Sequence, residues 1–302
     1  MPFGKGLVPG WRSPPASSYR KGVRILVTGA KGLLGQAVVA EALDRRWSVI
    51  GAGRDVLDVR DPAACASVVG EVRPDAVVHC AAYTNVDGAE DEEPLALEVN
   101  RDGARNVAEA AMAVDAVMVF PSTDYVFDGT TDQPYHENDE PAPLGAYGRS
   151  KLAGEEAVRA LGVAHLIVRT SWLYGSGGRN FVDTIRTLAA ERDELRVVSD
   201  QRGRPTWSTS LARGVLDLLA EDARGTLHAC DSGSASWIEL ARSILEIIGL
   251  EARLVPVTTA EWNARAPRPR YSVMALDRAE TILGHPFPHW RESLASYLRG
   301  EP

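Results

Sequence analysis

The amino-acid sequence predicts an α/β fold, with a doubly wound parallel sheet followed by a smaller C-terminal α/β lobe. Three observations carry this prediction. Short, almost continuously apolar runs alternate with helical patterns from Val23 to Arg169, and a glycine-rich turn begins directly after the first run, at Gly29. Beyond Arg169 the pattern loosens. Strands that are apolar along their whole length are buried on both faces, so helices should cover both sides of the sheet.

Each element of the first half follows from a local pattern. The run VRILVT is short and apolar, which favours a strand, whereas Leu34, Val38 and Leu43 recur at spacings of four and five, which indicates a helix. Asp61-Pro62 is typical of an N-cap followed by proline at the first helical position. By such patterns we expect strands at 23–28, 47–52, 75–80, 116–122 and 164–169, and helices at 33–46, 63–72, 95–114 and 147–161.

The second half and the N-terminal tail are less regular. We expect helices at 180–192, 208–220, 237–248 and 290–298, and short strands at 195–198, 226–229 and 253–257. Residues 264–271 form a loop rich in proline and arginine. The first 22 residues have no apolar run, so we expect a disordered tail and not a signal peptide.

Composition excludes several classes of function. The 302 residues include 33 Lys and Arg against 41 Asp and Glu, a net charge of −8, which argues against a nucleic-acid or anionic-membrane binder. Apolar runs are far shorter than the roughly 20 residues of a membrane helix. The three cysteines are widely spaced and form no C-x-x-C, so neither a disulfide framework nor a metal site is expected, and the expected location is cytoplasmic.

The first chemical motif is Thr28–Gly35, TGAKGLLG, with glycines at 29, 32 and 35 between the first strand and the first helix. Small residues there allow a tight turn, a close approach to a pyrophosphate and packing of helix on strand. The helix N-terminus then faces the phosphates. We therefore expect a Rossmann-type NAD(P)-binding domain over residues 23–170, and a mainly substrate-binding lobe over 171–302, with the chain crossing between the two.

The end of the second predicted strand bears on the choice of cofactor. An acidic residue is expected there when the adenosine ribose carries a free 2′-hydroxyl, but this strand ends Ala52-Gly53-Arg54. Arg54 and Lys31 are placed to attract a 2′-phosphate, which favours NADPH over NADH. The alternative is that Arg54 is an ordinary solvated loop charge.

The second motif is Tyr147-Gly148-Arg149-Ser150-Lys151 at the start of a predicted helix. Spacing i, i+4 puts Tyr147 and Lys151 on one face, where the cation should lower the pKa of the phenol and make it a usable acid. A surface pair is the alternative for such residues in isolation. A third element, STDYVFDG, follows the fourth strand, where Thr123 could bond a substrate carbonyl or the tyrosine. A turn cap is the alternative there.

Taken together, these motifs resemble the extended short-chain dehydrogenases/reductases, and more narrowly the dTDP-4-dehydrorhamnose reductase family. The resemblance runs from about Arg24 to Trp207, and is weaker beyond. The matching segments are TGAKGLLGQ (28–36), LDVRDP (57–62), RPDAVVHCAAYTNVDGAE (73–90), VNRDGARNVAEAA (99–111), STDYVFDG (122–129), YGRSKLAGE (147–155), RTSWLYG (169–175), NF (180–181) and QRGRPTW (201–207).

The resemblance implies roles for individual residues. Tyr147 would be the acid, Lys151 would orient the nicotinamide ribose, and Thr123, Asp124 and Trp172 would meet the sugar. The cofactor would lie against Gly29, Gly32, Leu33, Leu34, Gly35, Asp58, Val59, Ala81, Ala82, Tyr83 and Thr84. Independently of the resemblance, a net-acidic chain that places several arginines on two loops can direct some of them at a diphosphate. Candidates for polar contacts with the nucleotide of the substrate are therefore Ser232, Gln201, Arg202, Arg204, Arg268 and Arg270. Solvated loop charge is the alternative for at least two of these residues.

The chain departs from the family pattern in two places. One is the end of the second strand, described above, which lacks the acid that some NADH-preferring relatives carry. The other is Ala37: some members dimerise around Mg²⁺ through an acidic residue at this position, two positions after the third glycine. The sequence therefore does not support a Mg²⁺-bridged dimer, and a monomer or weak homodimer is expected.

The resemblance thus implies a reductase that uses NADPH, or NADH, on the C4 ketone of a nucleotide-activated 6-deoxysugar. The substrate best supported is dTDP-4-dehydro-L-rhamnose. Two alternatives stay open. One is an epimerase or dehydratase of the same superfamily, although Tyr125 replaces the glutamate of the dehydratase S-T-D-E pattern. The other is a non-catalytic regulatory subunit resembling that of methionine adenosyltransferase.

Overall fold

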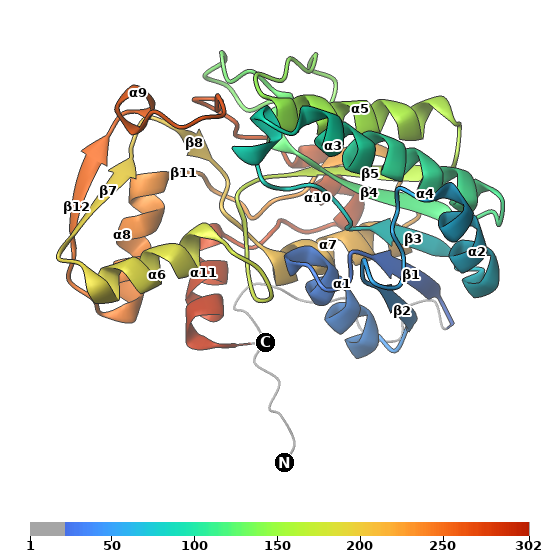
Figure 1. The fold of residues 1–302 in the computed structure, drawn as a ribbon. Coiled ribbons are helices and arrows are strands. Elements are labelled where there is room, and N and C mark those ends of the chain that lie inside the picture. Colours follow the sequence, from blue (N-terminus) through green and yellow to red (C-terminus); the bar gives the residue numbers. More distant parts are fainter. Residues whose placement is uncertain (1–21, 302) are drawn as a thin grey trace.

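The computed structural model describes residues 22–301 (Figure 1). The tail expected over 1–22 lies outside the described residues, except for Gly22. Six strands form one parallel sheet in the order β10-β5-β4-β3-β1-β2. They are β1 (Arg24–Thr28), β2 (Ser48–Ala52), β3 (Ala76–His79), β4 (Val117–Thr123), β5 (His165–Thr170) and β10 (Gly225–His228).

Two layers of helices cover the sheet, as the apolar strands require. Helices α1 (Leu33–Asp44) and α7 (Ser208–Ala220) pack together on one face, and α2 (Pro62–Val72), α4 (Gly103–Met112) and α5 (Ala146–Ala160) lie on the other (Figure 1). Alternate side chains of β1 serve the two faces: Ile25 and Val27 join the core beneath α1 and α7, while Leu26 joins the core beneath α2 and α4.

The sheet is doubly wound, and this fixes where a ligand can bind. From β1 the chain builds β2 on one side and β3, β4 and β5 on the other, so the strand order reverses between β1 and β3. Open α/β sheets bind ligands outside the carboxyl ends of their strands at such a reversal. Thr28, at the end of β1, is aligned with His79 of β3, and Thr123 of β4 with Thr170 of β5. The predicted site residues follow these ends.

A second lobe lies beside the sheet, on the left of Figure 1, around a third apolar core. Its longer strands pair in parallel and its short strands pair as β6 with β9 and β8 with β11. Helix α10 packs instead on α7 and β10. The bounds are α6 (Phe181–Glu191), β7 (Glu194–Val198), α8 (Trp237–Ile248), β12 (Arg253–Val257), α11 (Trp290–Arg299), β6 (Leu173–Tyr174), β8 (Arg202–Gly203), β9 (Thr206–Trp207), β11 (Ala235–Ser236), α9 (Thr259–Trp262) and α10 (Asp277–Leu283).

One predicted helix is interrupted. The sequence predicts a single helix over 95–114, whereas the structure has α3 (Glu93–Leu97), a π-helical turn at Glu98–Asp102 and then α4. Asn100 in this turn is buried and binds both backbone groups of Tyr83, at 2.8 and 3.0 Å. Such turns often mark functional regions, and this one faces the loop that follows β3.

Candidate active site

The glycine-rich turn is packed too tightly for side chains. A Cβ on Gly29, whose φ is +61°, would lie 2.5 Å from the backbone nitrogen of Ala81, and a Cβ on Gly35 would lie 2.3 Å from the carbonyl oxygen of Gly29. Gly32 is the N-cap residue of α1 and has no side chain to cap it. The first amide groups of α1 are therefore open to an anionic ligand, and these residues fit a pyrophosphate.

The two leucines of this motif have different surroundings. Leu34 is 8% exposed and belongs to the core beneath α1. Leu33 lies against the loop before α6, where a Cβ on Gly178 would come within 3.3 Å of its side chain. A second glycine-rich segment, Gly175–Gly178, therefore borders the turn; sequence analysis missed this neighbour because it is distant in the chain.

Charge at the end of β2 is arranged differently from the prediction. Lys31, expected to attract a 2′-phosphate, donates to both carboxylate oxygens of Asp55 at 2.8 Å, while Arg54 is exposed. Asp58 is held by Arg60, and this hydrogen bonding lowers the pKa of Asp58 to about 2. The acid that strand β2 itself lacks is thus supplied three residues later by Asp55.

Hydrogen bonds to neighbouring elements hold three more of the predicted cofactor residues. Val59 is buried, and its carbonyl accepts from the amide of Asn106 at 3.0 Å. The amide of Ala81 donates to the hydroxyl of Thr28 at 3.3 Å. Tyr83 donates from its hydroxyl to Glu92 at 2.7 Å. The loop Ala81, Ala82, Tyr83 and Thr84 directly follows β3, at the same sheet edge as the glycine-rich turn.

Tyr147 and Lys151 both lie on α5, and their surroundings shift the two pKa values in opposite directions. Lys151 is buried and donates to the carbonyl oxygen of Pro121 at 2.7 Å. Burial lowers the pKa of Lys151 to about 8. Burial and the nearby charge of Asp124 raise the pKa of Tyr147 to about 12, and the hydroxyl of Thr123 opposes this. The pKa of the phenol is therefore raised by its surroundings and not lowered as the sequence predicted, while the ammonium of Lys151 is bonded to β4.

Thr123 and Asp124 lie at the end of β4. The hydroxyl of Thr123 contacts Asp124 at 3.2 Å and accepts from the amide of Tyr125 at 3.1 Å, so it also caps the turn. Asp124 is 2% exposed, and the hydroxyl of Ser272 donates to it at 2.5 Å. Burial raises the pKa of Asp124 to about 7. Ser272 comes from the C-terminal part of the chain, and no sequence pattern pointed to it.

A buried ion pair between Glu155 and Arg169 lies next to these residues. Glu155 is fully buried, accepts from Ser122 at 2.5 Å and binds Arg169 at 2.8 and 2.9 Å. Glu155 lies one turn after Lys151 on α5, and its charge opposes the fall in the lysine's pKa. The carboxyl ends of β4 and β5 are thereby joined to α5. The sequence carries two signals for Glu155: its i, i+4 spacing from Lys151 and its place at the end of the matching segment YGRSKLAGE.

The side chain of Trp172 packs against Trp237 and Gly203 of the second lobe. Its ring stacks on that of Trp237 with 3.5 Å between centres and 4° between planes, and its φ is +45°. Gly203 lies against the same ring, with its hypothetical Cβ 2.5 Å away. Trp172 remains half-buried. A role at the sugar stays a prediction, and Trp237, which sequence analysis missed, is its main partner.

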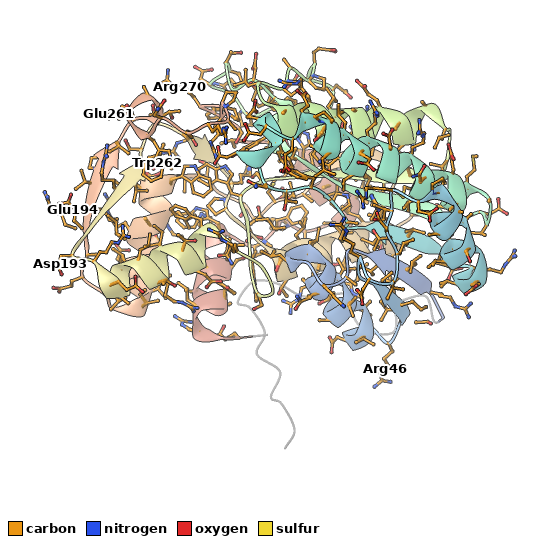
Figure 2. All side chains as sticks on the ribbon, viewed as in Figure 1. Arg46, Asp193, Glu194, Glu261, Trp262 and Arg270 are labelled. Atoms are coloured by element: carbon orange, nitrogen blue, oxygen red, sulfur yellow. The ribbon has the colours of Figure 1, made fainter. Side chains whose placement is uncertain are left out.

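The polar candidates of the second lobe mostly have protein partners. Arg204 donates to the carbonyls of Met274 and Gly233, and Arg268 binds Asp87 at 2.9 Å. The others are as follows: Arg202 pairs with Glu239, Gln201 bonds Trp237 and Thr259, Ser232 pairs its backbone with Pro288 and Trp290, and Arg270 is exposed (Figure 2).

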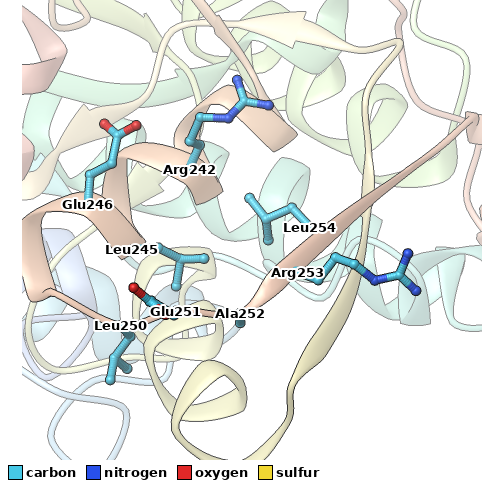
Figure 3. Close-up of a pocket in the computed structure, with 8 residues that line it drawn as sticks. All are labelled: Arg242, Leu245, Glu246, Leu250, Glu251, Ala252, Arg253 and Leu254. Atoms are coloured by element: carbon cyan, nitrogen blue, oxygen red, sulfur yellow. The ribbon is translucent and has the colours of Figure 1, made fainter.

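Other features of the described residues lie apart from this edge. A surface pocket of the second lobe is lined by residues of α8, β12 and their connection, among them Arg242 and Leu254 (Figure 3), and by none of the predicted site residues. Within residues 22–301, no group of three or more His, Cys, Asp or Glu side chains could hold a metal ion. In the same range, no helix has both the length and the apolar character needed to cross a membrane.

A glycine turn that can receive a pyrophosphate shares its sheet edge with a tyrosine four residues before a lysine. This combination defines an NAD(P)-binding oxidoreductase of the short-chain dehydrogenase/reductase type. Comparison with known proteins narrows the class. The family model "RmlD substrate binding domain" matches residues 23–301, and the chain belongs to this family. It is a dTDP-4-dehydrorhamnose reductase-like oxidoreductase.

Individual relatives span almost the whole chain. A dTDP-4-dehydrorhamnose reductase of Streptomyces griseus is 44% identical over 279 residues, covering 90% of this chain and 91% of the relative. A dTDP-4-keto-6-deoxy-D-glucose reductase of Streptomyces niveus is 40% identical, with 90% and 95% covered. The crystal structure of dTDP-4-dehydrorhamnose reductase from Bacillus anthracis in complex with NADP aligns with a TM-score of 0.90 and 40% identity, covering 92% of this chain and 99% of that one.

Proposed function

We propose that the protein reduces the C4 ketone of a nucleotide-activated 6-deoxysugar with NADPH, and that dTDP-4-dehydro-L-rhamnose, converted to dTDP-L-rhamnose, is its substrate. The observation that carries the proposal is the placement of Tyr147, Lys151 and Thr123 at the sheet edge that also holds the glycine-rich turn. The S. griseus relative supports the choice of sugar, and the NADP complex of the B. anthracis relative supports the cofactor.

We assign cofactor binding and proton transfer to different residues. The first amides of α1 would hold the pyrophosphate, with no side chain at Gly29, Gly32 or Gly35 to block its approach. When bound, the nicotinamide supplies a hydride to the ketone carbon. Tyr147 gives its proton to the oxygen that becomes the hydroxyl, and its high pKa keeps that proton in place at neutral pH.

Thr123 and Lys151 would assist at the same place. The hydroxyl of Thr123 lies beside Asp124 and is placed to hydrogen-bond the substrate oxygen together with the phenol. Lys151 is held by Pro121 and would bind the ribose of the nicotinamide, as the resemblance implies. A cytoplasmic location and a monomeric or weakly dimeric state stay predictions from the sequence.

Two alternatives are less well supported. A dehydratase needs a carboxylate where this chain has Tyr125, whose ring meets Tyr147 edge-on at 5.9 Å between centres. Burial raises the pKa of Tyr125, so its phenol does not supply the base that the glutamate of a dehydratase provides. A regulatory subunit needs no acid at all, so the turnover measurement described below is what separates it from a reductase.

The test is consumption of NADPH with dTDP-4-dehydro-L-rhamnose, followed by identification of the sugar formed, with dTDP-4-keto-6-deoxyglucose as a second substrate. We expect turnover and dTDP-L-rhamnose. Turnover only of the second sugar would overturn the choice of substrate. No turnover with either sugar, together with co-purification of a partner enzyme, would overturn the reductase proposal.

A further inference from the structure

The helix that carries Tyr147 begins without a cap of its own. Its N-cap residue is Gly145, which has no side chain, so the first amide groups of α5 need acceptors from elsewhere. The amide of Ala146 donates to the carboxylate of Glu90 at 2.8 Å, although the two residues are 56 positions apart. A Cβ on Gly145 would lie 2.7 Å from the same oxygen, so the lack of a side chain at Gly145 leaves room for Glu90.

Glu90 is itself held in place from both sides. It ends the 3₁₀ helix Gly88–Glu90, and its neighbours are bound by the arginine-rich loop of the second lobe. Arg268 binds Asp87 at 2.9 and 3.1 Å, and Arg265 forms an ion pair with Asp91. The carboxylate that caps α5 therefore belongs to a segment that is joined by two ion pairs to the loop carrying Arg265 and Arg268.

The position of this bond matters for the reaction. Tyr147 is the next residue after Ala146, and Lys151 follows one turn later. First turns of helices fray, and a carboxylate at the N-terminus is favoured both by the charge-assisted hydrogen bond and by the helix dipole. Glu90 also lines a small pocket together with Tyr125, Tyr147 and Pro267, so its carboxylate is within the site's surroundings.

We propose that Glu90 is a positioning residue for the reduction: it caps α5 from outside the helix and fixes the first turn, which carries Tyr147. The inference rests on the proposed function. It assigns the arginine-rich loop a role as well, because Arg265 and Arg268 hold the segment that holds α5.

The experiment compares four variants with the wild type. Glu90→Ala removes the acceptor, and Glu90→Gln keeps an acceptor oxygen without the charge. The double variant Glu90→Ala/Gly145→Ser gives α5 a cap of its own, since Gly145 has φ −110° and ψ 166°, an extended conformation that a capping serine adopts. The matched control is Glu93→Ala, which removes a carboxylate that binds the Arg149 side chain of the same helix at 2.7 Å, but no backbone amide.

We expect Glu90→Ala to lower kcat by about tenfold or more, because small misplacements of a reacting group are costly. KM for NADPH should change less than kcat, since the glycine-rich turn lies on another element and Lys151, one turn further along α5, keeps its bond to Pro121. Glu90→Gln and the double variant should recover most of the turnover, and Glu93→Ala should resemble the wild type. Turnover of Glu90→Ala close to that of the wild type, or no recovery in a folded double variant, would overturn the proposal.

Hydrogen exchange of the peptide covering residues 146–151 separates this inference from the proposed function. Exchange should be faster in Glu90→Ala and restored in the double variant, whether or not the chosen sugar is a substrate. An inactive wild type would overturn the proposed function alone. Unchanged exchange in Glu90→Ala would overturn the role of Glu90 alone.

Discussion

The ammonium group of Lys151 donates a hydrogen bond to the carbonyl oxygen of Pro121 over 2.7 Å. It lies 4.1 Å from the centre of the Phe120 ring, and the side chain is 4% exposed. The cation is thus fixed against β4, where burial lowers its pKa from 10.5 to about 8. A charge in such a place costs folding free energy at neutral pH, because folding removes it from water.

Replacing Lys151 with methionine should therefore separate stability from activity. The unfolded chain binds this proton up to a higher pH than the folded protein, so wild-type stability rises as pH increases from about 8 to 10.5. At pH 7, Lys151→Met should have a Tm no lower than the wild type, and its advantage should shrink across that window. Turnover should fall on the order of 10²-fold with the loss of a preorganised donor. A lower Tm at pH 7 with an unchanged kcat would contradict both expectations.

Tyr147→Phe tests the proton donor directly. The ring and its edge-on contact with Tyr125 are kept, so the fold should survive, while general acid catalysis worth about 10²–10⁴-fold in kcat is lost. Because the pKa of Tyr147 is raised to about 12, the wild-type phenol stays protonated at neutral pH. At pH values below about 9, its ionisation should therefore cause no decrease in the rate of reduction. Steady-state kinetics and circular dichroism check this. Near-complete turnover in a folded Tyr147→Phe protein would rule out Tyr147 as the acid.

The cofactor preference should depend on Asp55 as well as on Arg54. Asp55 binds Lys31 through both oxygens and places a negative charge near the end of β2. Asp55→Asn should free Lys31 for a 2′-phosphate and raise the NADPH-to-NADH ratio of kcat/KM by up to about fivefold, as expected for an exposed pair worth at most about 1 kcal/mol. Arg54→Ala should lower the same ratio. The measurement is kcat/KM with each cofactor, and a wild type that uses NADH equally well would refute the preference.

Local patterns predicted the regular elements well, because caps and apolar spacing are properties of neighbouring residues. Helix α8 spans Trp237–Ile248 as expected, with a capping box of Ser236 and Glu239 at its start. The interruption at Glu98–Asp102 was not predicted; within it, Asn100 bonds to Tyr83 of another loop, a contact that no local pattern shows. Tertiary contacts outweigh helical propensity there.

In the candidate site, too, the sequence predicted local motifs and missed contacts between residues that are distant in the chain. Glycine spacing and the Tyr147–Lys151 spacing could be found because each is a local motif. Glu90 and Ser272 could not, because each acts on a residue far away in the chain: Glu90 on Ala146, and Ser272 on Asp124. Burial also determines which charges interact, and sequence spacing does not show burial.

Another buried carboxyl group, Asp231, lies away from the candidate site and should make stability depend on pH. Asp231 is completely buried where the two lobes meet, and burial raises its pKa from 3.8 to about 7. It accepts from the amide of Trp207 at 3.1 Å and from the hydroxyl of Ser210 at 2.5 Å, and that hydroxyl also bonds to the carbonyl of Trp207 at 2.9 Å. A neutral side chain at Asp231 can keep all three bonds, with Ser210 donating to the carbonyl and accepting from the acid or an amide.

Asp231→Asn should consequently stabilise the protein at high pH. Between about pH 4 and 7 the folded protein holds a proton on Asp231 that the unfolded chain has lost, so the free energy of unfolding falls as pH rises through this window, by at most about 4 kcal/mol. In Asp231→Asn this residue cannot ionise, so it causes no fall in the free energy of unfolding as pH rises. Its unfolding free energy from urea titration should exceed that of the wild type at pH 8, and the difference should shrink toward pH 4. Asp124 contributes a loss of the same sign, but it is present in both proteins and cancels in the comparison. Parallel pH profiles for the two proteins would show that Asp231 is already ionised in the folded state.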